Sequence, residues 1–249
     1  MGQSMALGTE QASSPTHGPG RVDLVLLGIL AVVAGLVDVI GFIRVGHVFT
    51  AHITGNLVVM AEEIANGGPP HVAQLLSIPV FVIAVAFAHV LVLQTRASRG
   101  RLPLLLGQAA LLVLVVYFAL RANEVDAPTP KQEILAAMLA VAAMAFQNTF
   151  VRVSLHDSST TSVMTGNVAT LVIASLGVFW PGPWTYEEAA RKLRRTWPLV
   201  VGFFAGCVLG AAAATRLGPW AWSLPALLSL AAIPVGVRVP LPLTPQLGR

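Results

Sequence analysis

The chain has 249 residues, of which 55% are hydrophobic and 10% charged, whereas an average soluble domain carries about 25% charged residues. Its mean hydropathy of +0.77 likewise leaves too little polar surface to cover a globule in water. These values exclude a soluble enzyme and a DNA-binding module, and the single cysteine excludes a scaffold held by internal disulfides. The composition predicts an all-α integral membrane protein, whose net charge of +4 we interpret as a topology signal rather than a nucleic-acid-binding patch.

Two polar tails flank the apolar part of the chain. Residues 1–20 are rich in Gly, Pro, Ser and Thr and lack hydrophobic periodicity, which predicts a disordered cytoplasmic tail. Residues 239–249 are predicted to be a second cytoplasmic tail. Between the tails, residues 21–122 and 132–238 are predicted to form two membrane repeats.

A membrane-spanning helix needs about 20 mainly apolar residues. Six segments approach this length: Leu24–Ile43, Pro79–Gln94, Pro103–Leu120, Ile134–Val151, Pro198–Thr215 and Ala221–Val237. Two further apolar segments, Gly46–Ala65 and Ser159–Phe179, are interrupted by Thr, Gly and Asn. The chain therefore has six, seven or eight spans, depending on whether these two segments cross the membrane. A charged stretch, Glu187–Arg195, is predicted to be a separate short helix at the cytoplasmic interface.

The distribution of Lys and Arg favours six spans, because these residues concentrate on the cytoplasmic side. If neither interrupted segment crosses, 11 of the 15 basic residues lie on the side of the N-terminus and 4 on the other. If both cross, the split is only 9 to 6. A seven-span arrangement with the N-terminus outside also gives 11 to 4, but it treats the two interrupted segments differently although they resemble each other. We therefore predict six spans with both termini in the cytoplasm.

The two interrupted segments contain the same tripeptide. Thr54-Gly55-Asn56 recurs as Thr165-Gly166-Asn167, 111 residues later. Each copy follows a span with polar residues near its end, Asp38 in the first half and Gln147-Asn148 in the second, and each precedes two further spans. This order of features predicts an internal duplication.

The stretch Gly35-Leu36-Val37-Asp38, followed by the two Thr-Gly-Asn elements, resembles the YoaK-like family of bacterial inner-membrane proteins, a domain of unknown function. The resemblance runs over roughly Leu24–Val237. It implies a multi-pass protein of the bacterial cytoplasmic membrane and no established substrate or reaction.

Three spans in each half would place the two repeats in inverted orientation, an arrangement that often builds a binding site near the membrane midplane. We expect each Thr-Gly-Asn segment to be an interrupted or re-entrant helix. Thr54 or Thr165 would cap its start, the glycine would allow a sharp reversal of the chain, and Asn56 or Asn167 would supply amide donors and acceptors. Such irregular backbone requires burial in protein or a wet cavity, which predicts a polar pathway.

Asp38 is the strongest candidate site residue, since an acid inside a span costs roughly 2.5–3.5 kcal/mol on insertion scales. It would bind a cation, carry a proton or hydrogen-bond the neighbouring Thr-Gly-Asn element. The alternative is a structural role, in which Asp38 caps the backbone of a loop. Asn148 occupies the comparable place in the second half, beside Gln147, and there interhelical hydrogen bonding is the alternative to a pathway role.

Histidines and glycines within the apolar segments are further candidates. His52 and His89 are candidates for lining a pathway. The alternative for His52, which like His47 lies shortly before the first tripeptide, is a plain interfacial position. The alternative for His89 is an interhelical hydrogen bond. Metal binding is not expected, because no cysteine or His-Glu-x-x-His spacing accompanies them. Gly202, Gly206 and Gly210 form a small-residue face for helix packing inside the chain, with a homodimer contact as the alternative.

The leading functional hypothesis is a small-solute transporter or channel with a polar site near the midplane. The alternative is a membrane scaffold or sensor partner. An intramembrane enzyme is disfavoured because no catalytic motif or acid pair is present. No cofactor is expected, and the predicted partners are the lipid bilayer and an unknown small solute.

Overall fold

The computed structural model describes residues 21–69, 71–95, 101–123, 130–154, 164–180 and 182–238, and the predicted tails lie outside these ranges. The described residues form helices and no strand. In chain order the elements are α1 (Arg21–Arg44), α2 (Ile53–Ala65), α3 (Val72–Gln94), α4 (Arg101–Asn123), α5 (Pro130–Ser154), α6 (Met164–Phe179), α7 (Tyr186–Arg216), the 3-10 helix η1 (Gly218–Trp222) and α8 (Ser223–Val237).

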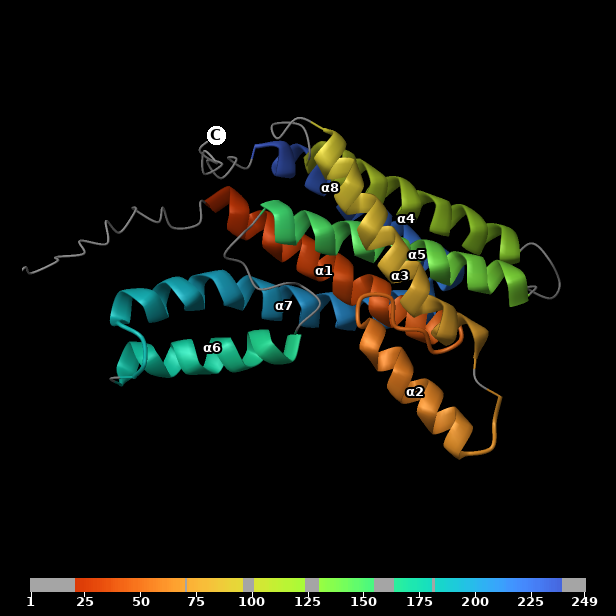
Figure 1. Cartoon of the computed structure of the whole chain (residues 1–249), viewed down its shortest axis with the longest axis horizontal. Helices are drawn as coiled ribbons and strands as arrows, with labels where there is room; N and C mark the ends of the chain where they lie inside the picture. The colour runs from red at the N-terminus through yellow and green to blue at the C-terminus, as the bar shows by residue number, and fades with distance from the viewer. Residues whose placement is uncertain are drawn as a thin grey trace, which may run out of the picture.

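Six segments are long and apolar enough to cross a membrane, and they correspond to the six predicted spans. In Figure 1, α1, α4 and α7 run in one direction and α3, α5 and α8 in the other. Two contacts along α1 fix the antiparallel course of α8, because Gly236 lies by Leu26 and Trp222 by Gly41. These directions are those of six alternating crossings.

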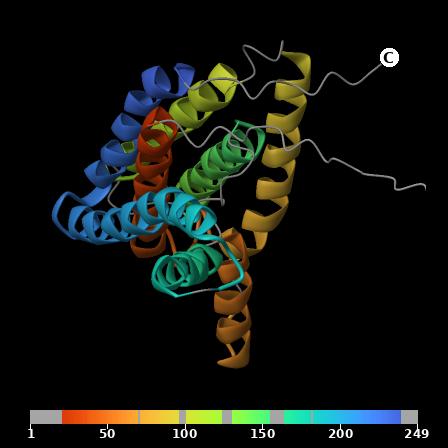
Figure 2. The same ribbon diagram turned by 90° about the vertical axis from the view of Figure 1, so that its left-hand side faces the viewer.

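The helices α2 and α6 differ from the spans in length. With a rise of 1.5 Å per residue, the 13 residues of α2 extend about 20 Å and the 16 residues of α6 about 24 Å, less than the roughly 30 Å of a hydrocarbon core. α2 packs on α3 and projects from the bundle (Figures 1 and 2), whereas α6 lies along α7.

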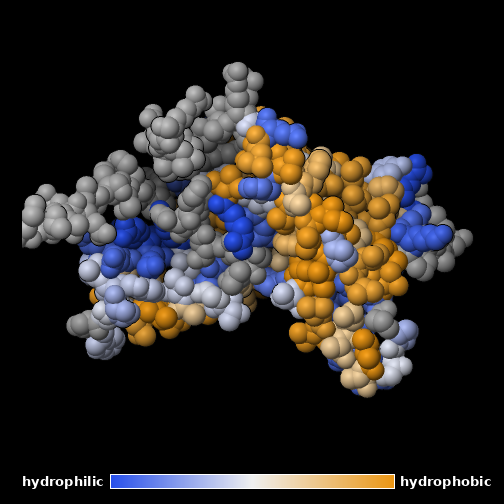
Figure 3. Space-filling model, in the orientation of Figure 1, coloured by the Kyte–Doolittle hydropathy of each residue, from blue (hydrophilic) through white to orange (hydrophobic). Residues whose placement is uncertain are grey.

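The packing of the spans follows one pattern in both halves of the chain. α1 packs on α7 and α8, and α5 packs on α3 and α4, while α4 and α8 contact each other. If α1, α3 and α4 are exchanged with α5, α7 and α8, in that order, this same set of helix contacts is obtained. α1 and α5 are the most enclosed spans, whereas α3 lies at the periphery, and the outer face of the bundle is strongly hydrophobic (Figure 3).

The closest helix contact joins α1 and α7 through glycines. A Cβ on Gly202 would lie 2.8 Å from the carbonyl oxygen of Gly28, and one on Gly206 would collide with the carbonyl oxygen of Val32. Gly210 meets Leu36 one turn later, so α1 and α7 are parallel. The predicted glycine face thus packs against α1 within the chain, where backbones approach more closely than side chains would allow.

Two segments differ from the predictions. The expected interfacial helix Glu187–Arg195 is not separate, because α7 continues through Pro198 to Arg216. A capping box between Thr185 and Glu188 starts the helix at Tyr186, and the buried ring of Pro198 packs near Gly28 of α1. Likewise, α3 begins at Val72, seven residues before the predicted Pro79, which lies inside the helix.

Candidate functional site

The connector between α1 and α2 turns back along α1. Gly46 and His47 both adopt the left-handed region, with φ of 64° and 58°, and reverse the chain directly after the helix ends at Arg44. The sharp reversal predicted at Gly55 therefore occurs nine residues earlier. As a result, Thr50 lies beside Asp38, about 9 Å inside the end of α1 at 1.5 Å per residue.

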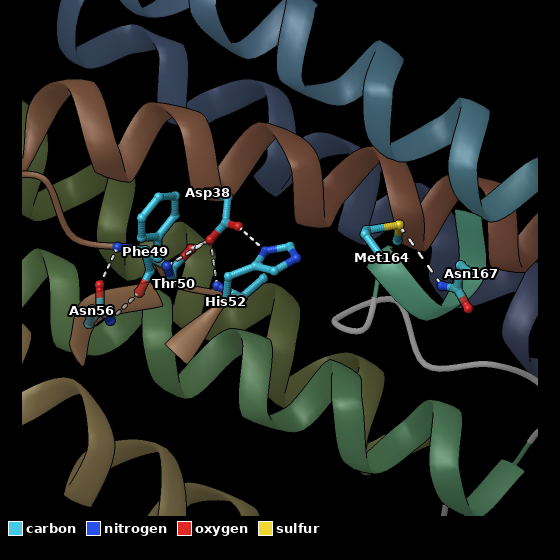
Figure 4. Close-up of polar contacts among 8 residues, drawn as sticks. Asp38, Phe49, Thr50, His52, Asn56, Met164 and Asn167 are labelled. Carbon is cyan, nitrogen blue, oxygen red and sulfur yellow. Dashed lines mark hydrogen bonds and ion pairs between the residues drawn. The ribbon is translucent and has the colours of Figure 1, made fainter. Parts of the chain in front are cut away.

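Asp38 binds this returning connector with both carboxylate oxygens (Figure 4). Its Oδ1 accepts hydrogen bonds from the backbone N–H groups of Thr50 (2.7 Å) and Ala51 (2.6 Å) and from the Thr50 hydroxyl (3.2 Å). Its Oδ2 pairs with Nδ1 of His52. The side chain is only 4% exposed, so the carboxylate is desolvated but fully engaged by these donors.

His52 connects this buried acid to the exterior. The imidazole packs edge-on against Phe203 of α7, with ring centroids 5.2 Å apart, and its side chain remains 28% exposed. His52 lies in the connector, outside the six spans. The hydrogen bond to Asp38 raises the pKa of the imidazole above its ordinary value, the negative charge of Asp38 acts in the same direction, and burial opposes them. The geometry is that of a proton-accepting pair with one exposed end.

Asn56 holds the start of α2 in place. Its Oδ1 accepts from the backbone N–H of Phe49 (2.7 Å), and its Nδ2 donates to the carbonyl of Phe49 (2.8 Å) and to the Ser77 hydroxyl of α3 (2.8 Å). Ser77 in turn donates to the carbonyl of Gln74 (2.6 Å). The amide thus pairs with the connector as a neighbouring strand would and ties α2 to α3.

The first two residues of the tripeptide do not act as predicted. Thr54 does not cap the helix, because α2 already begins at Ile53 and the exposed Thr54 side chain lies within its first turn. The N-cap position is occupied by His52, whose side chain is bound to Asp38 instead. Gly55 provides close packing, since a Cβ there would lie 2.9 Å from the ring of Phe49.

The second tripeptide opens α6 in the same way. Asn167 is buried, and its Nδ2 lies 3.9 Å from the sulfur of Met164 (Figure 4), whereas Thr165 and Gly166 are exposed in the first turn. The chain before Met164, residues 155–163, lies outside the described residues. Figure 4 places Asn167 apart from the Asp38 group, and α2 and α6 make no contact in the described part of the chain.

Gln147 belongs to a different polar cluster. Its Nε2 donates to the carbonyl of Leu30 on α1 (2.9 Å), and its Oε1 accepts from Nε2 of Gln108 on α4 (2.8 Å). Gln108 also reaches Ser229 of α8 (3.1 Å). Both glutamines and Ser229 are buried, so this cluster joins four spans. By contrast, Nδ2 of Asn148 donates within α5, to the carbonyl of Met144 (3.2 Å).

Sequence reasoning missed Gln108, Ser229 and Ser77, although each is a polar residue inside an apolar segment and could have been found by the criterion that selected Asp38. His89, for which the sequence left a pathway or an interhelical role open, is exposed on α3 and takes no part in the hydrogen bonds of either cluster. Within the described ranges, no group of three or more His, Cys, Asp or Glu side chains is arranged to hold a metal ion.

Two sequence comparisons relate the chain to known proteins. A family model described as "Protein of unknown function (DUF1275)" matches residues 26–235. Over 41 residues the chain is 51% identical to the UPF0700 transmembrane protein YoaK of Bacillus subtilis (strain 168), a match that covers 16% of the chain and 18% of that relative. No solved structure matches. The predicted resemblance to YoaK-like membrane proteins is thereby confirmed.

Proposed function

Because the chain belongs to the DUF1275 family of membrane proteins, whose function is unknown, we propose that it is a small-solute transporter or channel of the bacterial cytoplasmic membrane. The observation that carries the proposal is the buried Asp38 in contact with the partly exposed His52. Ionisable residues inside membrane spans commonly mark ion and proton pathways. In this proposal, His52 and Asp38 exchange a proton with a polar path through the membrane.

The course of α2 and α6 supports a re-entrant arrangement. The connector returns from the end of α1 to Asp38 before α2 begins, and α2 then runs in the direction of α1 toward the same end (Figure 1). α6 runs the opposite way along α7, with Gly177 close to Ala189 near the start of α7. Each short helix would therefore begin inside the membrane and leave on the side from which the chain entered.

The neighbour relations support two inverted repeats. Under exchange of the halves, the α1–α7 contact corresponds to α5–α3 and the α4–α5 contact to α8–α1. α1 and α5 occupy equivalent places but run in opposite directions (Figure 1). Inverted repeats of this kind are typical of transporters with alternating access. Transport, rather than catalysis, is the activity that we assign to this arrangement.

A scaffold or sensor partner is the second candidate. The observation that favours it is the complete engagement of the Asp38 carboxylate and the Asn56 amide by groups of the same chain. Such contacts serve to hold a connector whether or not a solute passes. The two candidates therefore differ in what they require of His52, since only a pathway depends on its titration.

The purified protein in liposomes tests the proposal. Proton flux is followed with an enclosed pH-sensitive dye, alone and with amino acids, organic acids, sugars, nucleobases and inorganic anions in turn. We expect the wild-type protein to move protons or at least one of these solutes, His52→Asn to lose this activity, and His89→Asn, which alters an exposed histidine outside the cluster, to retain it. Wild-type vesicles that match empty vesicles on every probe would favour the scaffold.

Labelling of single cysteines tests the orientation. With Cys207 replaced by Ala, a cysteine is placed at residue 4, 66 or 183, and intact cells are treated with a membrane-impermeant thiol reagent. The six-span arrangement with both termini in the cytoplasm predicts labelling at residue 66 and none at residues 4 and 183 until the cells are opened. Protection of residue 66 in intact cells contradicts re-entry of α2 from the outer side.

A further inference from the structure

An apolar groove runs along the outer face of the α1–α7 contact. It has a volume of about 420 Å³, and α8 contributes Leu228 to one side. On α1 its lining runs from Leu24 to Val32, which is about 12 Å of helix, and on α7 it runs from Trp197 to Gly202. Gly28 and Gly202 are part of this lining and contribute only backbone atoms to it. Its shape is that of a slot for a hydrocarbon chain.

The groove leads to a basic segment of α7. Trp197 is 50% exposed at its end, where indole rings typically lie at the level of lipid headgroups. Arg194 precedes Trp197 by three residues and Pro198 by four, so it continues the same face of the helix, and its side chain is exposed. The first ten residues of α7 hold four basic and two acidic side chains and form part of a hydrophilic patch in Figure 3.

We propose that this groove binds one anionic phospholipid, with an acyl chain between α1, α7 and α8 and the headgroup phosphate at Arg194. The apolar lining and the arginine at the same end match the two parts of such a molecule. Basic sites between spans on the cytoplasmic side commonly hold acidic lipid headgroups. This inference does not depend on transport, because none of the groove residues belongs to the Asp38 cluster.

The equivalent groove in the other half provides a contrast. It lies between α3, α4 and α5, has a volume of about 470 Å³ and is lined by residues such as Phe87, Gly107 and Phe146. Neither groove has a charged side chain in its lining, but the stretch of α3 before this groove, Val72–Pro79, carries no basic residue equivalent to Arg194. We expect this groove to take acyl chains of any phospholipid, whereas the α1–α7–α8 groove selects the headgroup.

Native mass spectrometry of the full chain in detergent tests the proposal. The protein is mixed with equal amounts of dioleoyl phosphatidylglycerol and dioleoyl phosphatidylcholine, and the lipids retained per chain are counted. We expect the wild-type protein to retain one phosphatidylglycerol preferentially. Arg194→Gln should reduce this preference about fivefold, because one basic residue near an anionic lipid contributes about 1 kcal/mol. Arg216→Gln removes an exposed arginine at the far end of α7 and should preserve it.

A second pair of variants tests the acyl-chain part. Val201→Trp fills the groove and should abolish retention of phosphatidylglycerol, whereas Val208→Trp, at a similarly exposed position of α7 outside the groove, should not. Both positions are more than half exposed, so the larger ring does not disturb the core. The proposal would be overturned if the wild-type protein retained the two lipids equally or if the two variants of a pair had equal effects. A lipid-free dimer that these variants dissociate would also overturn it.

Discussion

Asp38 and Gln147 are buried polar residues in spans that each precede a Thr-Gly-Asn element, yet they bind different kinds of partners. The hydrogen bonds of Asp38 go to residues 12 to 14 positions further along the chain, in the connector that follows its own helix. Gln147 binds α1 across 117 positions and reaches α4 across 39. The charged group closes a local loop and extends to the exterior through His52, whereas the neutral amides join distant spans.

This difference follows from the chemistry of the two groups. A buried carboxylate needs several donors, and successive backbone N–H groups of a returning connector provide them at close range. A carboxamide both donates and accepts, so it can continue a chain of hydrogen bonds between helices without a charge in the hydrocarbon region. The ionisable site thus lies within the first half of the chain, whereas the neutral cluster joins the two halves.

Removal of the acid should have the largest effect on stability. Asp38→Ala leaves the buried N–H groups of Thr50 and Ala51 without an acceptor, and at roughly 1–3 kcal/mol for each we expect a loss of about 3 kcal/mol. Tryptophan fluorescence during denaturant unfolding in detergent measures it. Asp38→Asn, which keeps an acceptor oxygen, should lose less. Unchanged stability of Asp38→Ala would show that the connector does not depend on this carboxylate.

The amide of Asn56 should come next. Asn56→Ala removes three hydrogen bonds, two of them to the backbone of Phe49, and we expect a loss of about 2 kcal/mol in the same unfolding measurement. Thr54→Ala is the matched control, because its exposed side chain should change stability by no more than about 0.5 kcal/mol. Equal effects of the two variants would contradict the role assigned to Asn56.

The neutral cluster should contribute less per contact. Gln108→Ala breaks contacts to Gln147 and Ser229, and interhelical hydrogen bonds in membranes average about 0.6 kcal/mol, so we expect a loss of about 1 kcal/mol. A double-mutant cycle with Gln147→Ala should give a coupling of about 0.6 kcal/mol. A cycle between Gln108→Ala and Asp38→Asn should be additive. Strong coupling in the latter cycle would mean that the two clusters act as one unit.

The smallest effect should be the dependence on pH. Because the pKa of His52 is raised in the folded chain, its contact with Asp38 contributes to stability below the ordinary histidine pKa of about 6.5, and this contribution disappears as the pH rises through the folded pKa. NMR titration of labelled histidines, assigned with His52→Asn, measures the shift. Asp38→Asn should lower the pKa of His52, and an unchanged pKa would argue against the pair.

Much of the fold was predictable from hydropathy alone. Spans must be long and apolar to lie in a bilayer, so the six crossings and the intervening short segments are evident in the residue pattern. Helix ends were predicted less well. Pro79 and Pro198 were interpreted as the starts of spans, but both lie within helices that continue through them although each proline lacks a backbone N–H.

For the site, the sequence by itself indicated that Asp38 and Asn56 take part in hydrogen bonds, because polar groups in an apolar segment require partners. It did not determine which partners, since Phe49, Thr50 and Ala51 act through backbone groups that any residue carries. Only the tertiary structure decided that the chain reverses at Gly46 and His47, that the Gly206 face meets α1 and that Gln108 joins Gln147. These contacts depend on helix positions in space, which local residue patterns do not encode.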